Sequence, residues 1–178
     1  MQIRATCLVD IMTKLHPITS VDDVHRLALM AHEIWNEFFP SIIGQAQVDY
    51  MVETFQSEKA LTAQLNEGYT YFFICDDEAR IGYIGLVPRP DKNALQISKF
   101  YLFKDARAKG HGRSVINEVH KIAASNGVDC LYLTVNKYND ETITAYQKMG
   151  FTRSGDIIMD IEGGFIMDDY EMTMTVSD

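Results

Sequence analysis

Cysteines are scarce in this sequence, and acidic residues outnumber basic ones. The three cysteines, Cys7, Cys75 and Cys130, are far apart and form no Cys-x-x-Cys pair, which predicts reduced thiols in a cytoplasm and neither a disulfide nor a zinc site. The 16 lysines and arginines against 25 aspartates and glutamates leave a formal net charge of -9. Such a charge argues against nucleic acid and anionic membranes as partners.

Long apolar runs are absent as well. Runs such as residues 71–75 are far shorter than the roughly 20 residues that cross a membrane as a helix, so no membrane span is expected. Arg4 is followed by no apolar stretch with a small-residue cleavage site, so no secretory signal is expected. With 178 residues, 47% of them hydrophobic, the chain is long enough for a domain with a core. We expect one domain over residues 12–178, with residues 1–11 as an extension or the product of an alternative start.

The first half is predicted to place helices between short strands. Ser20, with Asp23 three residues later, is expected to cap a long amphipathic helix that Pro40 closes. Two β-prone segments further on form a hairpin that Pro88 and Pro90 are expected to end. The other expected helices are residues 45–55 and 57–66, and the expected strands are residues 11–18, 70–75 and 81–87.

The second half is predicted to alternate strands and helices and to finish in a hairpin. Apolar and polar side chains alternate over residues 170–176, which is the period of a half-buried strand. Together the elements indicate a mixed α/β fold with an antiparallel first half and a terminal hairpin. The expected strands are residues 95–103, 130–135, 151–161 and 165–176, and the expected helices are one that Gly127 ends and a short one from Asn139 or Asp140 to Lys148.

Positive charge is concentrated in one stretch of this acidic chain. Residues 104–121 hold five basic residues and two acidic ones, whereas residues 153–178 hold seven acidic residues and one basic. Within the basic stretch, residues 107–114 read RAKGHGRS and join a predicted strand to a predicted helix. Glycines let backbone N–H groups approach a phosphate closely, and the helix start adds the positive end of its dipole. We therefore expect this loop to hold a pyrophosphate.

Two familiar phosphate-binding patterns do not match this loop. The Walker pattern is absent, and the dinucleotide fingerprint would need a glycine where Val115 stands. A glycine-rich helix start without any ligand remains an alternative interpretation of the loop taken alone.

Arg107, Gly110 and Gly112, which follow the strand at residues 95–103, resemble the coenzyme A loop of the GNAT superfamily of acyl-CoA N-acyltransferases. The signature of that loop is Gln or Arg, any two residues, Gly, any residue, and then Gly or Ala. The resemblance is close from residue 69 to the C-terminus and looser over the N-terminal helices. It implies a central, mostly antiparallel and splayed sheet of six to seven strands, flanked by four to five helices.

A second motif agrees with the first. Residues 133–136 (LTVN), followed by residues 139–151 with Tyr146 ahead of a Gly-Phe pair, are similar to the family's next strand and helix. The resemblance implies an N-acetyltransferase that moves the acetyl group of acetyl-CoA to a primary amine of a small molecule or polypeptide by direct attack on the thioester. It implies no metal, and it leaves a homodimer open. The nearest likeness is to small bacterial acetyltransferases, some of which act on polyamines.

The resemblance also implies roles for individual residues. Tyr146 would donate a proton to the leaving sulfur. Main-chain groups of the strand before the loop would pair with the pantetheine and polarise the thioester carbonyl. The residues implied for the cosubstrate are Phe100, Tyr101 and Leu102 on the strand, Arg107, Lys109, Gly110, His111, Gly112, Arg113 and Ser114 at the pyrophosphate, and Asn136, Asn139 and Thr142 at the pantetheine arm or its helix.

The general base is where the chain departs from the family. Many relatives have a glutamate in the middle of this strand, and this chain has Ser98, which cannot act as a carboxylate base. An alkyl ammonium has a reference pKa of about 10.4, so some group must remove its proton. A water chain held by Ser98 and Tyr101, or a carboxylate such as Glu33 or Glu37, would serve.

The acceptor side is expected at the N-terminal helices, which in the family close over the amine. The same aromatic residues also suit ordinary core packing. The residues expected to bind the acceptor are Trp35, Phe38 and Tyr50. A non-catalytic acyl-CoA-binding regulatory module remains the alternative function, whereas a kinase is disfavoured by the missing Walker lysine.

Overall fold

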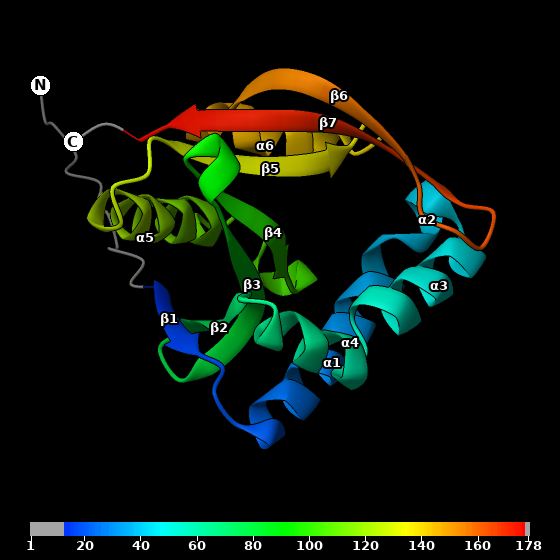
Figure 1. Cartoon of the computed structure of the whole chain (residues 1–178). Coiled ribbons are helices and arrows are strands. Elements are labelled where there is room, and N and C mark those ends of the chain that lie inside the picture. The colour runs from blue at the N-terminus through cyan, green and yellow to red at the C-terminus, as the bar shows by residue number, and fades with distance from the viewer. Residues whose placement is uncertain (1–12, 177–178) are drawn as a thin grey trace, which may run out of the picture.

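The structure is a computed structural model that describes residues 13–176, so Cys7 and the expected N-terminal extension lie outside the described residues. Residues 13–176 form seven strands, six α-helices and two short 3-10 helices (Figure 1). The strands are β1 (Thr13–Pro17), β2 (Thr70–Asp76), β3 (Ala79–Arg89), β4 (Ala94–Leu102), β5 (Cys130–Asn136), β6 (Thr152–Asp160) and β7 (Ile166–Thr175). The helices are α1 (Val21–Phe38), α2 (Pro40–Ile43), α3 (Gln45–Phe55), α4 (Glu58–Asn66), α5 (His111–Ser125), α6 (Asp140–Met149), η1 (Pro90–Lys92) and η2 (Lys104–Ala106).

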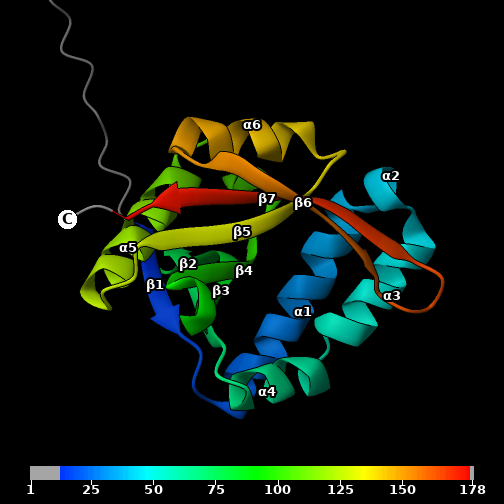
Figure 2. The ribbon, with the colours of Figure 1, turned by 45° about the horizontal axis from the view of Figure 1, so that its top comes forward.

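All seven strands belong to one sheet, in the order β1-β2-β3-β4-β5-β7-β6. Every neighbouring pair is antiparallel except β4 and β5, which are parallel. Helices α1 to α4 lie together, away from α5 and α6, as Figures 1 and 2 show. The predicted mixed α/β fold with a mostly antiparallel sheet is confirmed. No helix within the described range is long and apolar enough to cross a membrane.

Local sequence signals account for most element boundaries. The Ser20 side chain accepts a hydrogen bond from the Asp23 backbone N–H at 3.1 Å, and the Asp23 carboxylate accepts in return from the Ser20 backbone, so the predicted capping box forms. Helix α2 was not predicted. Pro40 begins this four-residue helix, because proline suits the first turn of a helix as well as the residue after one.

Strand β3 continues through Pro88 to Arg89, two residues past the predicted end. Its pairing with β2 stops at Leu86, so beyond that residue β3 has a partner on one side only. Proline lacks an N–H donor but is tolerated at such an edge, which explains why Pro88 does not terminate the strand.

Two cores cover the two faces of the sheet. One face packs against α5 and α6, and the other packs against α1 and α4. The first core includes Ile84, Leu95, Ile97, Val115, Ile116, Val119, Leu131, Leu133, Tyr146, Phe151 and Met172, and the second includes Leu27, Ala31, Ile34, Leu61, Tyr71, Phe73 and Tyr83. A third cluster joins Trp35, Phe39 and Val48 of α1 and α3, with Tyr101 packed against it.

A β-bulge at Ser98 changes which residues of β4 face each core. Leu86 of β3 pairs with Ile97 and Gly85 pairs with Lys99, so Ser98 is the extra residue. Before the bulge, Ile97 faces the α5–α6 core. After it, Phe100 faces that core, and Tyr101 faces the α1 side. The bulge therefore turns Lys99 and Tyr101 toward the N-terminal helices.

Lys99 is buried on that side without a carboxylate partner. Its side chain is 6% exposed, and its Nζ donates to Tyr71 Oη at 2.6 Å and to Gln64 Oε1 at 2.8 Å. Gly85 makes room for the Tyr71 ring, because a Cβ there would lie 2.6 Å from it. Burial lowers the pKa of Lys99 to about 8, since a desolvated ammonium with only neutral partners is disfavoured.

The buried ammonium makes stability depend on pH. The unfolded chain keeps the Lys99 proton up to a pKa near 10.5, whereas the folded chain releases it near 8. Between these values the unfolded state binds more protons, so the free energy of unfolding rises with pH. We expect a rise of about 2 kcal/mol between pH 7.5 and 9.5 that Lys99→Met removes. Urea denaturation of both proteins across this range measures it, and parallel curves would contradict it.

Candidate functional site

The parallel strands β4 and β5 separate soon after they meet. They pair only over Ala94–Gln96 and Cys130–Tyr132, yet β4 runs on to Leu102 and β5 to Asn136. Beyond Gln96 the only strand paired with β4 in the described structure is β3. The sheet is therefore splayed, as the family resemblance implied.

The splay leaves main-chain groups of β4 on an open edge. The Phe103 N–H donates to the Ile81 carbonyl of β3, and strand alternation then directs the main chain of Tyr101 to β3 as well. The N–H and C=O groups of Phe100 and Leu102 point the other way, toward β5. The Leu102 carbonyl already accepts from Arg107 Nε, so the groups placed to pair with an extended ligand are the Leu102 N–H and the main chain of Phe100.

The glycine-rich loop follows at the open end of the splay. Helix α5 begins at His111, and its N-cap Gly110 has a φ of +92°, a left-handed conformation that favours glycine. Ala108 also has a positive φ, +58°, which is uncommon for a residue with a Cβ. The first N–H groups of a helix have no intrahelical partner, so this turn presents donors and the positive end of a dipole.

Arg107 is held in place by contacts on three sides. Its Nε donates to the Leu102 carbonyl at 2.9 Å, a terminal nitrogen lies 3.0 Å from Glu37 Oε2, and the guanidinium lies 4.6 Å from the centre of the Phe38 ring. The ion pair joins the loop to α1. Phe38, which was expected to bind the acceptor, thus contacts the loop, and Glu37, a candidate base, is paired with a cation.

The side chains of the loop point in different directions. His111 is buried, with Nδ1 3.3 Å from Thr13 Oγ1 and Nε2 3.7 Å from Asp76, so its side chain ties α5 to β1 and β2. Arg113 donates to the Lys148 carbonyl at the end of α6 at 2.5 Å. Gly110 and Lys109 are exposed. The His111 side chain is therefore directed away from the open side, and only its backbone N–H lies at the helix start.

Tyr146 lies on α6 beside the strand that splays. Its side chain is 7% exposed, and its ring centre is 6.5 Å from that of Phe100 and 5.5 Å from that of Phe151. Burial raises the pKa of Tyr146 far above its ordinary value, so the phenol keeps its proton at any physiological pH. The structure brings Tyr146 close to Phe100, and a neutral phenol there can donate a proton.

The three polar residues expected near the pantetheine arm shape the turn between β5 and α6. The Asn139 side chain caps α6 by accepting from the Thr142 N–H at 3.4 Å. Asn136 Oδ1 accepts from the Tyr138 N–H at 3.0 Å. Of the two contacts expected for Asn139, the structure shows the one with the helix.

The residues expected to bind the acceptor are not gathered in one place. The Trp35 ring stacks on Phe39 at 4.3 Å and meets the edge of Tyr101 at 5.5 Å, so it lies near the splay. Tyr50 donates to the Ile161 carbonyl at 2.5 Å and packs on Phe165 at the tip of the β6–β7 hairpin. Tyr50 therefore fastens the hairpin tip to α3.

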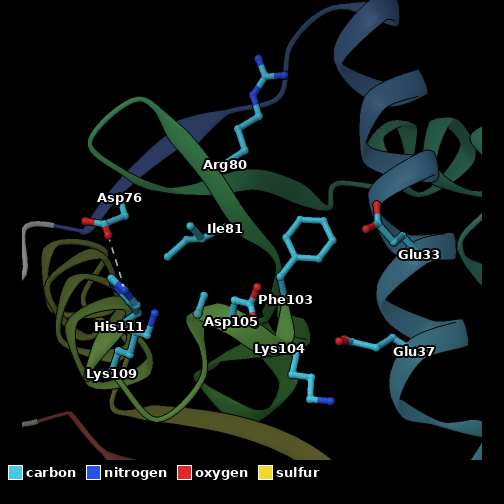
Figure 3. Close-up of a pocket in the computed structure, with 11 residues that line it drawn as sticks. Glu33, Glu37, Asp76, Arg80, Ile81, Phe103, Lys104, Asp105, Lys109 and His111 are labelled. Atoms are coloured by element: carbon cyan, nitrogen blue, oxygen red, sulfur yellow. Dashed lines mark ion pairs between the residues drawn. The ribbon is translucent and has the colours of Figure 1, made fainter.

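A cavity of about 500 Å³ lies beside the loop, between α1 and the β2–β3 turn. Figure 3 shows Glu33 and Glu37 on α1 across this cavity from His111 and Lys109. Neither Ser98 nor Tyr146 lines it. The two candidate carboxylates thus line a cavity that Tyr146 does not line.

One carboxylate that the sequence reasoning missed does lie with the aromatic cluster. Asp169 on β7 is 6% exposed, and it pairs in register with Asn136 of β5. Burial raises the pKa of Tyr101, and Tyr146 and Asp169 add smaller contributions in the same direction. A signal was present in the sequence, because two consecutive aspartates inside a predicted strand are unusual for that structure.

No group of three or more His, Cys, Asp or Glu side chains that could hold a metal ion occurs among the residues the structure describes. A splayed sheet with a glycine-rich helix start at its open end is the fold of acyltransferases that use acyl-coenzyme A. The chain belongs to the acetyltransferase (GNAT) family, whose model matches residues 28–151. It is an acetyl-CoA-dependent N-acetyltransferase, with acetyl-CoA as cosubstrate.

Solved structures share the fold over almost the whole chain. The PaiA N-acetyltransferase of Thermoplasma acidophilum, in complex with coenzyme A, is 21% identical with a TM-score of 0.73, over 92% of this chain and 99% of that one. A GCN5-related N-acetyltransferase of Rhodopseudomonas palustris is 16% identical with a TM-score of 0.75, over 92% and 96%. A spermidine N-acetyltransferase SpeG chimera from Vibrio cholerae and hSSAT is 16% identical with a TM-score of 0.67, over 92% and 95%.

Gly112 allows a test of the loop that leaves the fold intact. A Cβ at Gly112 would meet only Met149 Sδ and Phe100 Cζ, both at 3.9 Å, which is ordinary contact. Gly112→Ala should therefore keep or raise stability, by up to about 1 kcal/mol for a helical position. We expect acetyl-CoA to bind on the order of 10-fold more weakly, because the added methyl keeps a pyrophosphate away from the backbone.

Calorimetric titration with acetyl-CoA measures this affinity, and the melting temperature reports the fold. Gly155→Ala is the matched control, since a Cβ there also has room, at 3.8 Å from Glu171, and lies in β6. Equal affinities of Gly112→Ala and wild type would exclude the loop as the pyrophosphate site.

Proposed function

We propose that this acetyltransferase binds acetyl-CoA with its pyrophosphate at the start of α5 and its pantetheine along the open edge of β4. The observation that carries the proposal is the end of β4–β5 pairing at Gln96, which leaves the main chain of Phe100 and Leu102 facing an opening. Gly110, Gly112 and Arg113 supply backbone donors for the phosphates. Ser114, in the first turn of α5, and Lys109, in the loop before it, add polar side chains to the same site.

The chemistry proposed for this geometry has three requirements. The thioester carbonyl is polarised by main-chain N–H groups of β4, which act best in a site from which water is removed. The leaving thiolate takes the proton of the Tyr146 hydroxyl, which burial keeps protonated. The attacking nitrogen must arrive without its ammonium proton, which calls for a base that Ser98 does not provide.

The acceptor is proposed to be a small cationic primary amine, a polyamine in the first instance. Trp35, Phe39 and Tyr101 pack together as an aromatic wall on the α1 side of the splay, beside which the alkyl part of such an amine would lie. The chain's formal charge of -9 also favours such a ligand. The likeness to a spermidine N-acetyltransferase supports the choice of spermidine as the first acceptor to test.

The function is tested by incubating the protein with acetyl-CoA and a panel of spermidine, putrescine and a lysine-containing peptide. Release of free coenzyme A thiol and mass spectrometry of the acetylated amine give the rate and the product. A non-catalytic acyl-CoA-binding module would bind acetyl-CoA with no turnover on any amine. Competition by coenzyme A, and not by ATP, would distinguish this cosubstrate from a nucleotide.

Tyr146→Phe separates catalysis from binding. The variant keeps the ring packed between Phe100 and Phe151, so the fold and acetyl-CoA affinity should be retained. We expect kcat to fall by about 10²-fold, the lower end of general acid catalysis, because coenzyme A thiolate is already a fair leaving group. Tyr69→Phe, on a ring stacked against Tyr71 away from the splay, is the matched control. Equal kcat values for wild type and Tyr146→Phe would remove the phenol from the mechanism.

We further infer a cytoplasmic enzyme that forms a homodimer. Cys75 and Cys130 are both free thiols, which suits a reducing compartment. Strand β6 is an edge of the sheet, and Ile158 on it and Ile166 on β7 are 72% and 59% exposed. Exposed apolar residues on an edge strand favour pairing with a second copy. Light scattering of wild type and Ile158→Lys tests this, with a monomeric wild type as the contradicting result.

A further inference from the structure

Asp169 is a buried acidic side chain on β7, in register with Asn136 at the end of β5. It lies on the face of β5 and β7 that carries Thr134 and Asn136, opposite to the face that packs on α5 and α6. Lys137, the nearest cation, forms its ion pair with the adjacent Asp168. The Asp169 carboxylate thus has a hydrogen bond from Thr134 but no basic partner of its own among the described residues.

Tyr101 connects Asp169 to the proposed reaction centre. Tyr101 lies on β4 across the splay and packs against Trp35 and Phe39. Tyr101 and Asp169 both lie on the face of the sheet opposite to the α5–α6 core, and burial raises the pKa of Tyr101, with smaller contributions from Tyr146 and Asp169. Tyr101 on β4 and Asp169 at the end of the β5–β7 pairing therefore face the same side of the splayed sheet, and Tyr146 lies on α6 beside Phe100 of the splaying strand.

The electrostatic surroundings of Asp169 suit proton transfer. Burial raises the pKa of the Asp169 carboxyl to about 6, the hydrogen bond from Thr134 lowers it, and Asp168 and Lys137 act in opposite directions. A carboxylate with a raised pKa is a stronger base than an ordinary aspartate, so it accepts a proton from an ammonium more readily. A pKa of about 6 still leaves the Asp169 carboxyl ionised at neutral pH.

We propose that Asp169 is the general base of this enzyme, the group that takes the proton from the acceptor's ammonium before attack. The inference rests on the proposed function and deepens it, because it fills the place that Ser98 leaves without a carboxylate. The other candidates are less well placed: Glu37 is paired with Arg107, and Glu33 lines the separate cavity beside the loop.

The proposed step balances as follows in atoms and charge. The ammonium gives one proton to the Asp169 carboxylate, and the neutral nitrogen forms a bond to the thioester carbonyl carbon. The carbon–sulfur bond then breaks, and the thiolate takes the proton of the Tyr146 hydroxyl. The second surplus proton of the nitrogen restores that hydroxyl through water, and the proton on Asp169 leaves to solvent. The net products are the acetylated amine, coenzyme A thiol and one proton.

The test compares the pH dependence of turnover in wild type and Asp169→Asn with acetyl-CoA and spermidine. For wild type, kcat/KM should rise as pH rises through about 6, because only the ionised carboxylate accepts the proton. Asp169→Asn should lower kcat by about 10²–10⁴-fold, and its kcat/KM should no longer show this rise near pH 6, the acidic limb of the pH profile. The deficit should shrink toward pH 10, where more of the acceptor arrives already neutral.

Two further variants keep the test decisive whatever the stability of Asp169→Asn. Asp168→Asn removes a neighbouring negative charge and releases Lys137, so it should lower the Asp169 pKa and move the limb to lower pH while activity is kept. Asp169→Glu keeps a carboxyl and should keep the limb. Glu118→Gln, which loses the exposed ion pair with Lys121 on α5, is the control and should behave as wild type.

Each result bears on a different part of the argument. A normal kcat and limb in Asp169→Asn, or an unmoved limb in Asp168→Asn, overturns the assignment. A raised KM with kcat and the limb intact also overturns it, because Asp169 would then attract the ammonium without taking its proton. If wild type acetylates no amine although it binds acetyl-CoA, the proposed function itself fails, and the base assignment fails with it.

Discussion

Main-chain hydrogen bonds join β4 to β5 over only three residue pairs, and the arrangement of the functional residues depends on where that pairing stops. A continuous parallel ladder would satisfy every main-chain group of both strands and leave no opening. The bulge at Ser98 follows within two residues of the break and reverses the facing of the residues after it. Phe100 therefore faces Tyr146, and Tyr101 faces Trp35, so the two sides of the opening acquire different chemistry.

Removal from water perturbs several titratable groups around this opening, each toward its neutral form. Desolvation raises the pKa of Tyr146 and of Asp169 and lowers the pKa of Lys99. Lys99 is on β4 next to the bulge, but its partners are Gln64 and Tyr71 under α4. It therefore contributes to the packing of the N-terminal helices, whereas Asp169 and Tyr146 share the neighbourhood of Tyr101. Burial alone therefore does not identify a functional group. The residues that surround the buried group must also be considered.

Periodicity, caps and glycines were sufficient to predict most elements, and the family was predicted from the resemblance of two motifs, at residues 107–112 and 133–151. The Ser20 capping box and the Asn139 cap are local signals, and they formed as expected. The splay was expected only from the family resemblance, and periodicity could not place the bulge at Ser98 or the end of the β4–β5 pairing, because both depend on register between strands. Asp169 was missed for a related reason: alternation in β7 assigned it to a polar face, and only the course of β5 and β4 shows that this face is enclosed.

The contacts of Arg107 determine how much side-chain conformational entropy this residue would lose when a ligand binds. The Leu102 carbonyl, the Glu37 carboxylate and the Phe38 ring already restrict its guanidinium. A free arginine side chain carries about 2 kcal/mol of rotamer entropy, and a side chain immobilised during folding loses little more on binding. Because Glu37 and Phe38 belong to α1, the position of this helix helps to hold the loop rigid. The two halves of the chain thus share one preorganised surface, assembled before either substrate is present.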